Sequence, residues 1–149
     1  MKIRISVAEE KLDYVENYLK DHGIEVSNDG EYVLSESTLD SDFIEVRNKE
    51  KDRLNVKTED IIFIEAFGKE IEIHTEKETY YAKDRMYELE SELDSKEFLR
   101  ISKSVIISKK HVRRIRPSLS MKYVLTLTGG TLVDVTRNYY NDFRRFFGI

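Results

Sequence analysis

Cationic side chains set among apolar ones give residues 98–117 the strongest chemical character in this sequence. Seven Lys and Arg residues fall in this stretch, and no Asp or Glu interrupts them. The apolar residues between them are mostly β-branched or aromatic, which favours strands with a half-buried face. Like charges repel one another and oppose folding, so a fold that holds them together is most simply explained by an anionic partner.

The net charge of −4 hides an uneven distribution of charge along the chain. Residues 1–60 hold 9 basic and 16 acidic residues (−7), and residues 61–97 hold 5 and 11 (−6). Residues 98–149 hold 11 basic and 2 acidic residues (+9). An acidic two-thirds followed by a basic third is an electrostatic footprint that the overall charge conceals. The alternative is that basic and acidic parts pair within the molecule, although surface ion pairs contribute little and need no such segregation.

The sequence lacks the residues and motifs that most kinds of catalysis and metal binding need. The absence of Cys excludes disulfides, thiolate metal sites and thiol nucleophiles. No His-Glu-x-x-His, Gly-x-Ser-x-Gly or P-loop pattern occurs, and Gly129-Gly130 is typical of a hairpin turn. The histidines are isolated, with His22 at a helix end, His74 on the polar face of a strand and His111 in a basic turn. We therefore predict a protein that is not an enzyme and has no metal and no cofactor.

Three cations lie where predicted strands end, at positions from which a side chain can reach out of a rigid sheet. Lys69 follows Phe67-Gly68, Lys103 lies between two serines, and Arg137 follows a strand that ends near residue 135. Arg and Lys bond to guanine edges or phosphates, and Ser and Asn add phosphate contacts. Taken singly, each of these cations could equally be a solvated surface charge.

The elements that position these cations follow from the spacing of apolar residues. Residues 2–7 alternate as a strand does, and residues 9–21 carry a helical stripe that His22-Gly23 ends. Short strands are expected at 24–26 and 32–34, and the polar, acidic residues 35–42 are typical of a linker.

From residue 43 onward, short strands and turn signals follow one another, which indicates a mainly antiparallel β unit. We expect Asp84 to cap a helix that ends near Asp94, and Asn138 to cap a short helix at the end of the chain. The predicted strands are 43–46, 53–56, 61–64, 70–75, 79–83, 104–107, 112–116, 123–127 and 131–135.

Five groups of residues, in order, resemble the LytTR DNA-binding domain, the output domain of a class of bacterial transcription regulators. The resemblance covers about residues 43–149 and implies a mainly β fold of stacked antiparallel sheets with short helices, here preceded by a small α/β segment. The groups are Ile61-Ile62-Phe63-Ile64-Glu65-Ala66-x-Gly68, Phe98-Leu99-Arg100-Ile101-Ser102-Lys103-Ser104, Val112-x-x-Ile115, Gly129-Gly130-Thr131 and Val135-Thr136-Arg137-Asn138-Tyr139.

The resemblance also implies sequence-specific binding of double-stranded DNA and regulation of transcription in bacteria. Loops of such domains enter successive major grooves, and their target sites are typically paired repeats. Carried over to this sequence, the base contacts are Lys69, Lys103 and Arg137, and the phosphate or supporting contacts are Arg100, Ser102, Ser104 and Asn138. The alternative is a non-DNA interaction module whose basic last third docks on an acidic protein or an anionic membrane surface.

The domain organisation that we expect has a strand–helix–strand segment at residues 1–40 and a LytTR-like domain at residues 43–149. Forty residues are near the lower limit for independent folding, so we expect this segment to pack on the rest of the chain or on a second copy, as a dimerisation or regulatory piece. We expect a homodimer at least on DNA. The first segment is also too short for the receiver domain of many family members. No apolar run approaches the ~18 residues of a membrane helix, so we expect a cytoplasmic protein without membrane insertion.

Overall fold

A computed structural model describes residues 1–36 and 42–149, and the chain divides into two compact units, Met1–Thr38 and Leu39–Ile149. Most of the linker predicted at 35–42 lies outside the described residues. Ser35, at its start, is instead the last residue of a strand.

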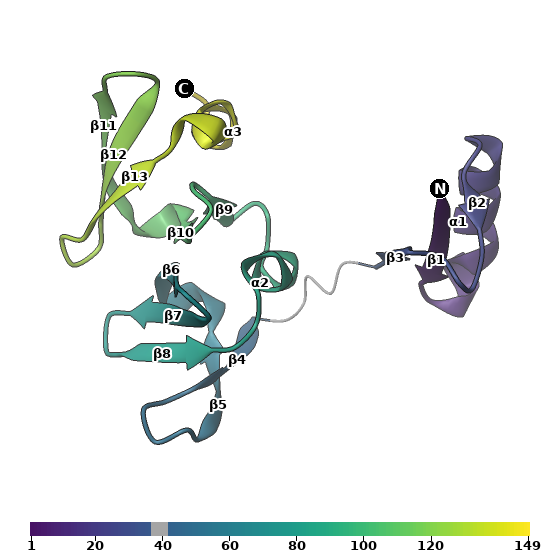
Figure 1. Cartoon of the computed structure of the whole chain (residues 1–149), viewed down its shortest axis with the longest axis horizontal. Helices are drawn as coiled ribbons and strands as arrows, with labels where there is room; N and C mark the ends of the chain where they lie inside the picture. Colours follow the sequence, from purple (N-terminus) through teal and green to yellow (C-terminus); the bar gives the residue numbers. More distant parts are fainter. Residues whose placement is uncertain (37–41) are drawn as a thin grey trace. The chain divides into compact units, whose positions relative to one another are not determined.

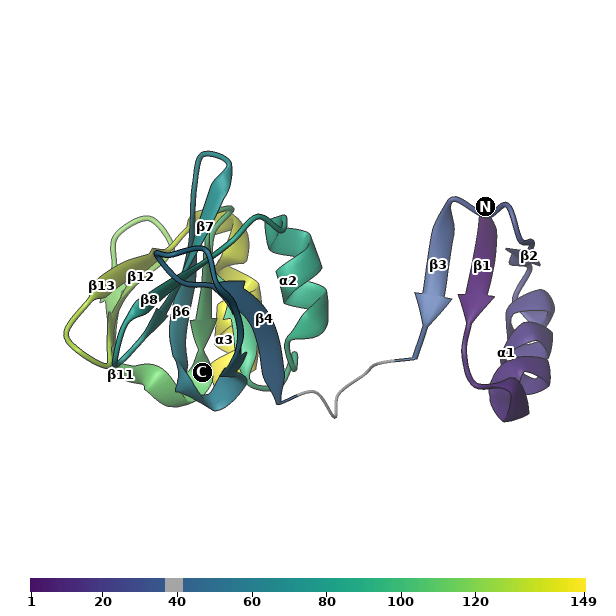
Figure 2. The ribbon, with the colours of Figure 1, turned by 90° about the horizontal axis from the view of Figure 1, so that it is seen from below.

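The first unit is a small parallel sheet joined to one helix. β1 (Lys2–Ser6) lies between β2 (Glu25–Val26) and β3 (Tyr32–Ser35) and is parallel to both. α1 (Glu9–Asp21) connects β1 to β2, as Figure 2 shows. Leu19 is the one buried side chain among residues 1–36, so the core of this unit is very small.

The second unit is organised around a seven-stranded antiparallel sheet with the order β5-β4-β8-β7-β6-β10-β9 (Figure 1). Residues 61–64 of β6 are all buried, because this strand lies inside the sheet and both faces of the sheet are covered. The strands are β4 (Phe43–Arg47), β5 (Arg53–Lys57), β6 (Ile61–Phe67), β7 (Glu70–Thr75), β8 (Thr79–Ala82), β9 (Phe98–Arg100) and β10 (Val105–Ser108).

A three-stranded antiparallel sheet, β11-β12-β13, and the last helix follow. Gly129 and Gly130, each with φ 91°, form the turn between β12 and β13, which confirms the glycine hairpin predicted there. The elements are β11 (Val112–Ser118), β12 (Lys122–Leu127), β13 (Leu132–Val135), the 3₁₀ turn η3 (Arg137–Tyr139) and α3 (Tyr140–Phe147).

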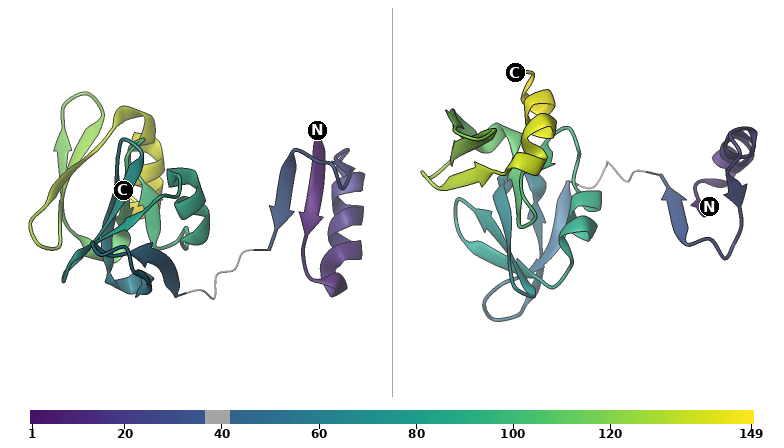
Figure 3. Two further views of the ribbon diagram at one scale, coloured as in Figure 1. Left: turned by 60° about the horizontal axis from the view of Figure 1, so that its bottom comes forward. Right: turned by 45° about the horizontal axis from the view of Figure 1, so that its top comes forward.

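Two hydrophobic cores on opposite faces of the large sheet hold the second unit together. Leu89 of α2 (Met86–Glu92) is buried in one core with Ile64 of β6. Phe143 of α3 is buried in the other core with Ile107 of β10 and residues of the small sheet. α2 and α3 therefore cover different faces of the large sheet (Figure 3). The fold is mainly β with stacked antiparallel sheets and short helices, as the resemblance implied.

Three local predictions need correction. β9 was not predicted as a strand, because its three residues are too short to show a period. Asp84 does not cap α2: the residue before the helix is Arg85, whose N–H lies 3.4 Å from the Glu88 carboxylate. Asn138 does not cap α3 either, because it lies within η3, and Tyr139 precedes the helix without a side-chain capping bond.

Candidate nucleic-acid interface

Two of the loops singled out in the sequence lie side by side at one end of the large sheet. β6 runs into the Gly68-Lys69 turn, and β10, its antiparallel neighbour, begins at the same end because Val105 pairs with Glu65. The backbone N–H of Ala66 donates to the carbonyl oxygen of Ser104 at 2.8 Å. The Lys69 turn is thus next to the loop at 101–104.

The third segment directly follows β13, and its Thr136 is hydrogen-bonded to the same loop. The Thr136 N–H donates to the Ile101 carbonyl at 3.0 Å, and the Thr136 hydroxyl donates to the same oxygen at 3.4 Å. Arg137 and Asn138 follow directly. The structure therefore brings together the 68–69 turn, the 100–104 loop and residues 136–138, although the last two lie 35 positions apart. We call this edge the loop end of the large sheet.

The three cations predicted to contact bases are free to reach a partner. Lys69, Lys103 and Arg137 are exposed, and none of them forms an ion pair with another described residue. Asn138, beside Arg137, is exposed as well. A cation that has no partner within the protein keeps its full charge for phosphates or base edges.

Arg100 has a different geometry, because its guanidinium turns back onto its own loop. The Nε group donates to the Ser102 carbonyl at 3.2 Å, and Nη2 donates to the Lys103 carbonyl at 2.6 Å. Nη1 lies 3.6 Å from a carboxylate oxygen of Glu90 in α2, and the Arg100 side chain is only 24% exposed. The planar fork of Arg suits this role, since it can bond two carbonyls at once. The guanidinium holds the loop that carries Lys103.

The two serines of this loop also bond locally. Ser102 is 8% exposed, and its hydroxyl oxygen accepts the Ser104 N–H at 3.3 Å. The hydroxyl oxygens of the two serines lie 3.5 Å apart. Ser102 therefore shapes the turn between β9 and β10, while Ser104 is half-buried beside it.

The sequence analysis missed a second group of cations at the loop end. A pocket of about 370 Å³ is lined by Arg47, Asn48, Lys49, Lys51, Glu70, Tyr81, Ala82 and Lys83. Glu70 directly follows Lys69, so this pocket adjoins the β6–β7 turn. The pocket depends on strand pairing, which places Ala82 opposite Ile71 and Arg47 opposite Tyr81. Only knowledge of this pairing could have revealed the pocket.

The basic last third is not neutralised within the described residues. Of the 11 basic residues in 98–149, two form ion pairs there, Arg100 with Glu90 and Arg145 with Asp142. Internal pairing of the basic and acidic segments therefore does not account for the +9 segment in the described part of the chain.

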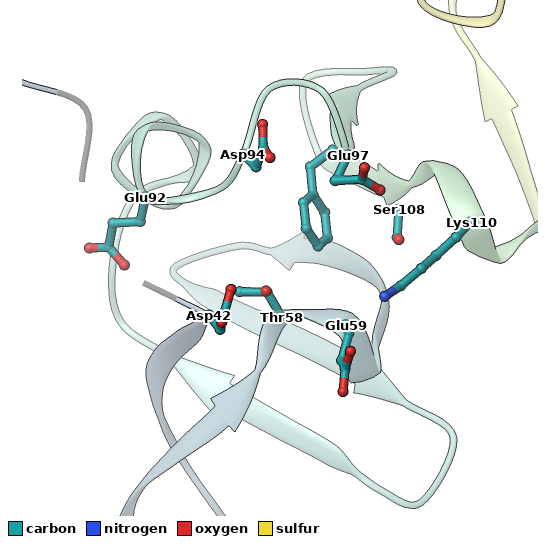
Figure 4. A pocket seen from close by; sticks show the side chains of 9 residues that line it. Asp42, Thr58, Glu59, Glu92, Asp94, Glu97, Ser108 and Lys110 are labelled. Atoms are coloured by element: carbon teal, nitrogen blue, oxygen red, sulfur yellow. The ribbon is translucent and has the colours of Figure 1, made fainter. Parts of the chain in front are cut away.

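The other end of the large sheet is acidic. A pocket of about 210 Å³ there includes Ser108, at the end of β10, and Glu59, just before β6 (Figure 4). Carboxylates repel a phosphodiester backbone, so the charge of this pocket disfavours a nucleic-acid partner. We call it the acidic end, and its lining residues are Asp42, Thr58, Glu59, Glu92, Asp94, Glu97, Phe98, Ser108 and Lys110.

Glu92, which lines this pocket, has a carboxyl with a raised pKa. Partial burial, followed by repulsion from Asp84, Glu88 and Glu45, raises the pKa of the Glu92 carboxyl above its ordinary value. Burial is the largest cause of this shift, and the three repelling carboxylates lie outside the acidic pocket.

Two histidines that looked like surface residues in the sequence have structural contacts. The His111 ring is buried, with Nε2 3.1 Å from the Glu59 carbonyl and Nδ1 3.0 Å from the Thr128 hydroxyl. The His74 ring is half-buried and stacks on Phe63 at a centroid distance of 4.2 Å. Within residues 1–36 and 42–149, no group of three or more His, Asp or Glu could hold a metal ion. In the same residues, no helix has the length and apolarity needed to cross a membrane.

Comparisons with known proteins agree with this geometry. The family model described as the LytTr DNA-binding domain matches residues 51–148. Sensory transduction protein LytT of Bacillus anthracis is 29% identical over 94 residues, which cover 63% of this chain and 38% of that protein. Transcriptional regulatory protein LytR of Staphylococcus aureus (strain N315) gives the same identity and the same coverage. The chain thus spans well under half the length of these relatives.

A solved structure supports the fold. The LytTr DNA-binding domain of a Bacillus cereus protein superposes with a TM-score of 0.69 at 23% identity, covering 73% of this chain and 99% of that domain. The family model matches well over half of the chain, and the loops characteristic of the resemblance meet at one end of the sheet. The chain therefore belongs to the LytTr family of DNA-binding domains.

Proposed function

We propose that this protein binds double-stranded DNA sequence-specifically and regulates transcription in bacteria, with the loop end of the large sheet facing the duplex. The observation that carries the proposal is the joining of three separate loops by backbone hydrogen bonds, each loop presenting one unpaired cation. A rigid array of outward cations fits the spaced negative charges of a duplex.

The proposed division of labour follows from the side-chain directions. Lys69, Lys103 and Arg137 reach bases in successive major grooves, and Asn138 adds a phosphate contact. Arg100 and Ser102 support the middle loop, since their polar groups bond within it. Ser104 belongs to the same supporting group. The protein acts in the cytoplasm and performs no catalytic step in this proposal.

The alternative partner, an acidic protein or an anionic membrane surface, is not favoured. Such a partner requires only a basic face, whereas family membership and the three joined loops both point to a duplex. DNA of different sequences separates the two possibilities directly, because a general electrostatic surface binds all duplexes alike.

The test is a selection from random duplexes with the purified full chain, followed by competition at one salt concentration. We expect an enriched sequence made of two repeats, which binds at least about 10³-fold more tightly than scrambled DNA. If no sequence is enriched, and scrambled DNA competes equally well, then sequence-specific readout is wrong.

We also propose that two copies act together on paired repeats through residues 1–40. Residues 1–36 bury one side chain, Leu19, and leave Tyr32, Val33 and Leu34 of the edge strand β3 exposed. An exposed, apolar edge strand is a template for pairing with another chain. Sedimentation of the full chain and of a 42–149 fragment on a two-repeat duplex should show cooperative binding for the full chain alone. Equal cooperativity of both proteins would remove residues 1–40 from the contact between copies.

A further inference from the structure

Four cationic side chains surround one pocket beside the start of β7. Arg47 ends β4, Lys49 and Lys51 lie in the β4–β5 hairpin, and Lys83 directly follows β8. Glu70 is the one carboxylate among the residues that line this pocket, so four positive charges less one negative charge leave +3. Glu50 of the same hairpin lines a neighbouring pocket, which Lys49 lines as well, together with Glu72 and Glu78.

Hydrogen bonds between Asn48 and Asp52 hold the hairpin in a fixed shape. The Asn48 N–H donates to the Asp52 carbonyl at 3.1 Å, and the Asp52 N–H donates to the Asn48 side-chain oxygen at 2.9 Å. The Asn48 amide also donates to the Asp52 carboxylate at 3.2 Å. The one Asp of the hairpin is thereby bonded to Asn48 and not to a lysine.

Lys51 has a backbone conformation that a lysine rarely adopts. Its φ of 67° is in the left-handed region, and its N–H donates to the Asn48 carbonyl at 3.1 Å. Gly fits this conformation without strain, and Asn tolerates it better than Lys does. A Lys at a position where Gly would be less strained indicates that the charge of its side chain has a function.

The four cations are also unpaired. None of Arg47, Lys49, Lys51 and Lys83 forms an ion pair with another residue in the described ranges, whereas Arg53 of the same hairpin lies 3.7 Å from a Glu45 carboxylate oxygen. None of the four is therefore within ion-pair distance of a described carboxylate, although Glu45, Asp84 and Glu92 line a neighbouring pocket together with Arg47 and Lys83.

The strand order places this pocket in line with the DNA-contacting loops. β8 lies two strands from β6 in the sheet, with β7 between them. Neighbouring strands are about 4.8 Å apart, so Lys83 is offset by roughly 10 Å from the end of β6.

We propose that Arg47, Lys49, Lys51 and Lys83 form a binding site for backbone phosphates of DNA, beside the groove into which Lys69 reaches. The proposal rests on the proposed function and extends its footprint beyond the three loops of the resemblance. Phosphate contacts carry no sequence information, so the site strengthens binding to every duplex and fixes the register of the domain.

The test measures the affinity of the full chain for its selected duplex and for scrambled DNA over a range of salt concentrations. Removing one phosphate contact lowers the slope of log K against log salt by about 0.9. We expect Lys51→Ala with Lys83→Ala to lower the slope by about 1.8 and to leave the ratio of specific to non-specific affinity unchanged. Lys51→Gly removes the charge and the backbone strain together. This variant should keep or raise the melting temperature while it weakens DNA binding, which excludes misfolding as the cause.

Lys96 provides the matched control, because it is exposed, forms no ion pair with a described residue and precedes Glu97 at the acidic end. Lys96→Ala should leave the slope nearly unchanged. Equal effects of Lys96→Ala and Lys51→Ala would show a diffuse charge effect, and a wild-type slope in the Lys51 and Lys83 variants would overturn the site. Arg137→Ala reports on the proposed function in the same assay. If Arg137→Ala loses specificity while the Lys51 and Lys83 variants bind DNA like the wild type, the pocket proposal is wrong and the proposed function still stands.

Discussion

The two ends of the large sheet are built from the same strands and carry opposite charge. At the loop end, Lys69 and Lys103 are exposed and unpaired within the described residues, next to loops joined by backbone hydrogen bonds. At the acidic end, five carboxylates and one lysine line a pocket, and the pKa of Glu92 is raised. The pairing of β6 with β10 fixes which residues reach which end. An antiparallel sheet can thus act as a rigid spacer between an end with unpaired cations and an end rich in carboxylates.

The difference between the ends also explains how the domain can be oriented on a duplex. Phosphates are attracted by the cations at the loop end and repelled by the carboxylates at the acidic end. Both interactions therefore favour an orientation in which the loop end faces the duplex. Substitutions at the two ends should therefore have different effects on DNA binding.

Arg137→Lys tests whether the loop end reads bases or only binds charge. Arg can bond guanine O6 and N7 together, and Lys cannot reproduce that fork. We expect a loss of about 1–3 kcal/mol on the selected duplex and little change on scrambled DNA, measured by competition at one salt concentration. Equal, small losses on both duplexes would mean that Arg137 binds without specifying sequence.

Arg100→Ala tests whether a cation at the loop end can act by holding a loop. Because its guanidinium bonds the carbonyls of Ser102 and Lys103, we expect the specific affinity to fall by about 1 kcal/mol, the scale of one net hydrogen bond. The salt slope should change by much less than the ~0.9 expected when one phosphate contact is removed.

Lys103→Ala is the matched comparison for Arg100, because it should lower the salt slope by about 0.9. If Arg100 acts through the position of Lys103, removing both side chains should weaken binding little more than removing Lys103 alone. Additive losses, or a slope change for Arg100→Ala equal to that for Lys103→Ala, would make Arg100 a direct phosphate contact.

Glu92→Gln probes the acidic end and should affect stability and not DNA binding. The folded state raises the pKa of Glu92 above its ordinary value of 4.5, so its ionisation opposes folding. This penalty is absent below about pH 4.5 and develops as the pH rises through the folded-state pKa. The carboxyl is partly solvated, so we expect a gain of less than about 1 kcal/mol at pH 7 that vanishes in acid, measured by denaturant unfolding. A gain independent of pH would point to packing instead of charge.

The features that could be predicted from the sequence are those set by neighbouring residues. The apolar run of β6, the glycine turn at 129–130 and the cations after strand ends all depend on local period and turn chemistry. These local features sufficed to place Lys69, Lys103 and Arg137 in exposed loops. The family resemblance implied that all three contact bases.

The features that the sequence did not reveal depend on pairings between distant segments. The ion pair of Arg100 requires Glu90 from α2, and the hydrogen bond of buried His111 requires the Glu59 carbonyl, 52 positions away. The cationic pocket requires β4 to lie beside β8, which no local pattern encodes. Asn138 has capping chemistry but lies within η3, one residue before Tyr139, which directly precedes α3.

The central claim is that DNA binds at the loop end and not at the acidic end, and charge reversal of two exposed lysines tests it most directly. Lys103→Glu and Lys96→Glu change the net charge of the protein by the same amount, at opposite ends of one sheet. The affinity of each variant for the selected duplex should be measured at one low salt concentration. We predict a loss of about tenfold or more for Lys103→Glu and a much smaller change for Lys96→Glu. Equal losses from both ends would contradict the claim.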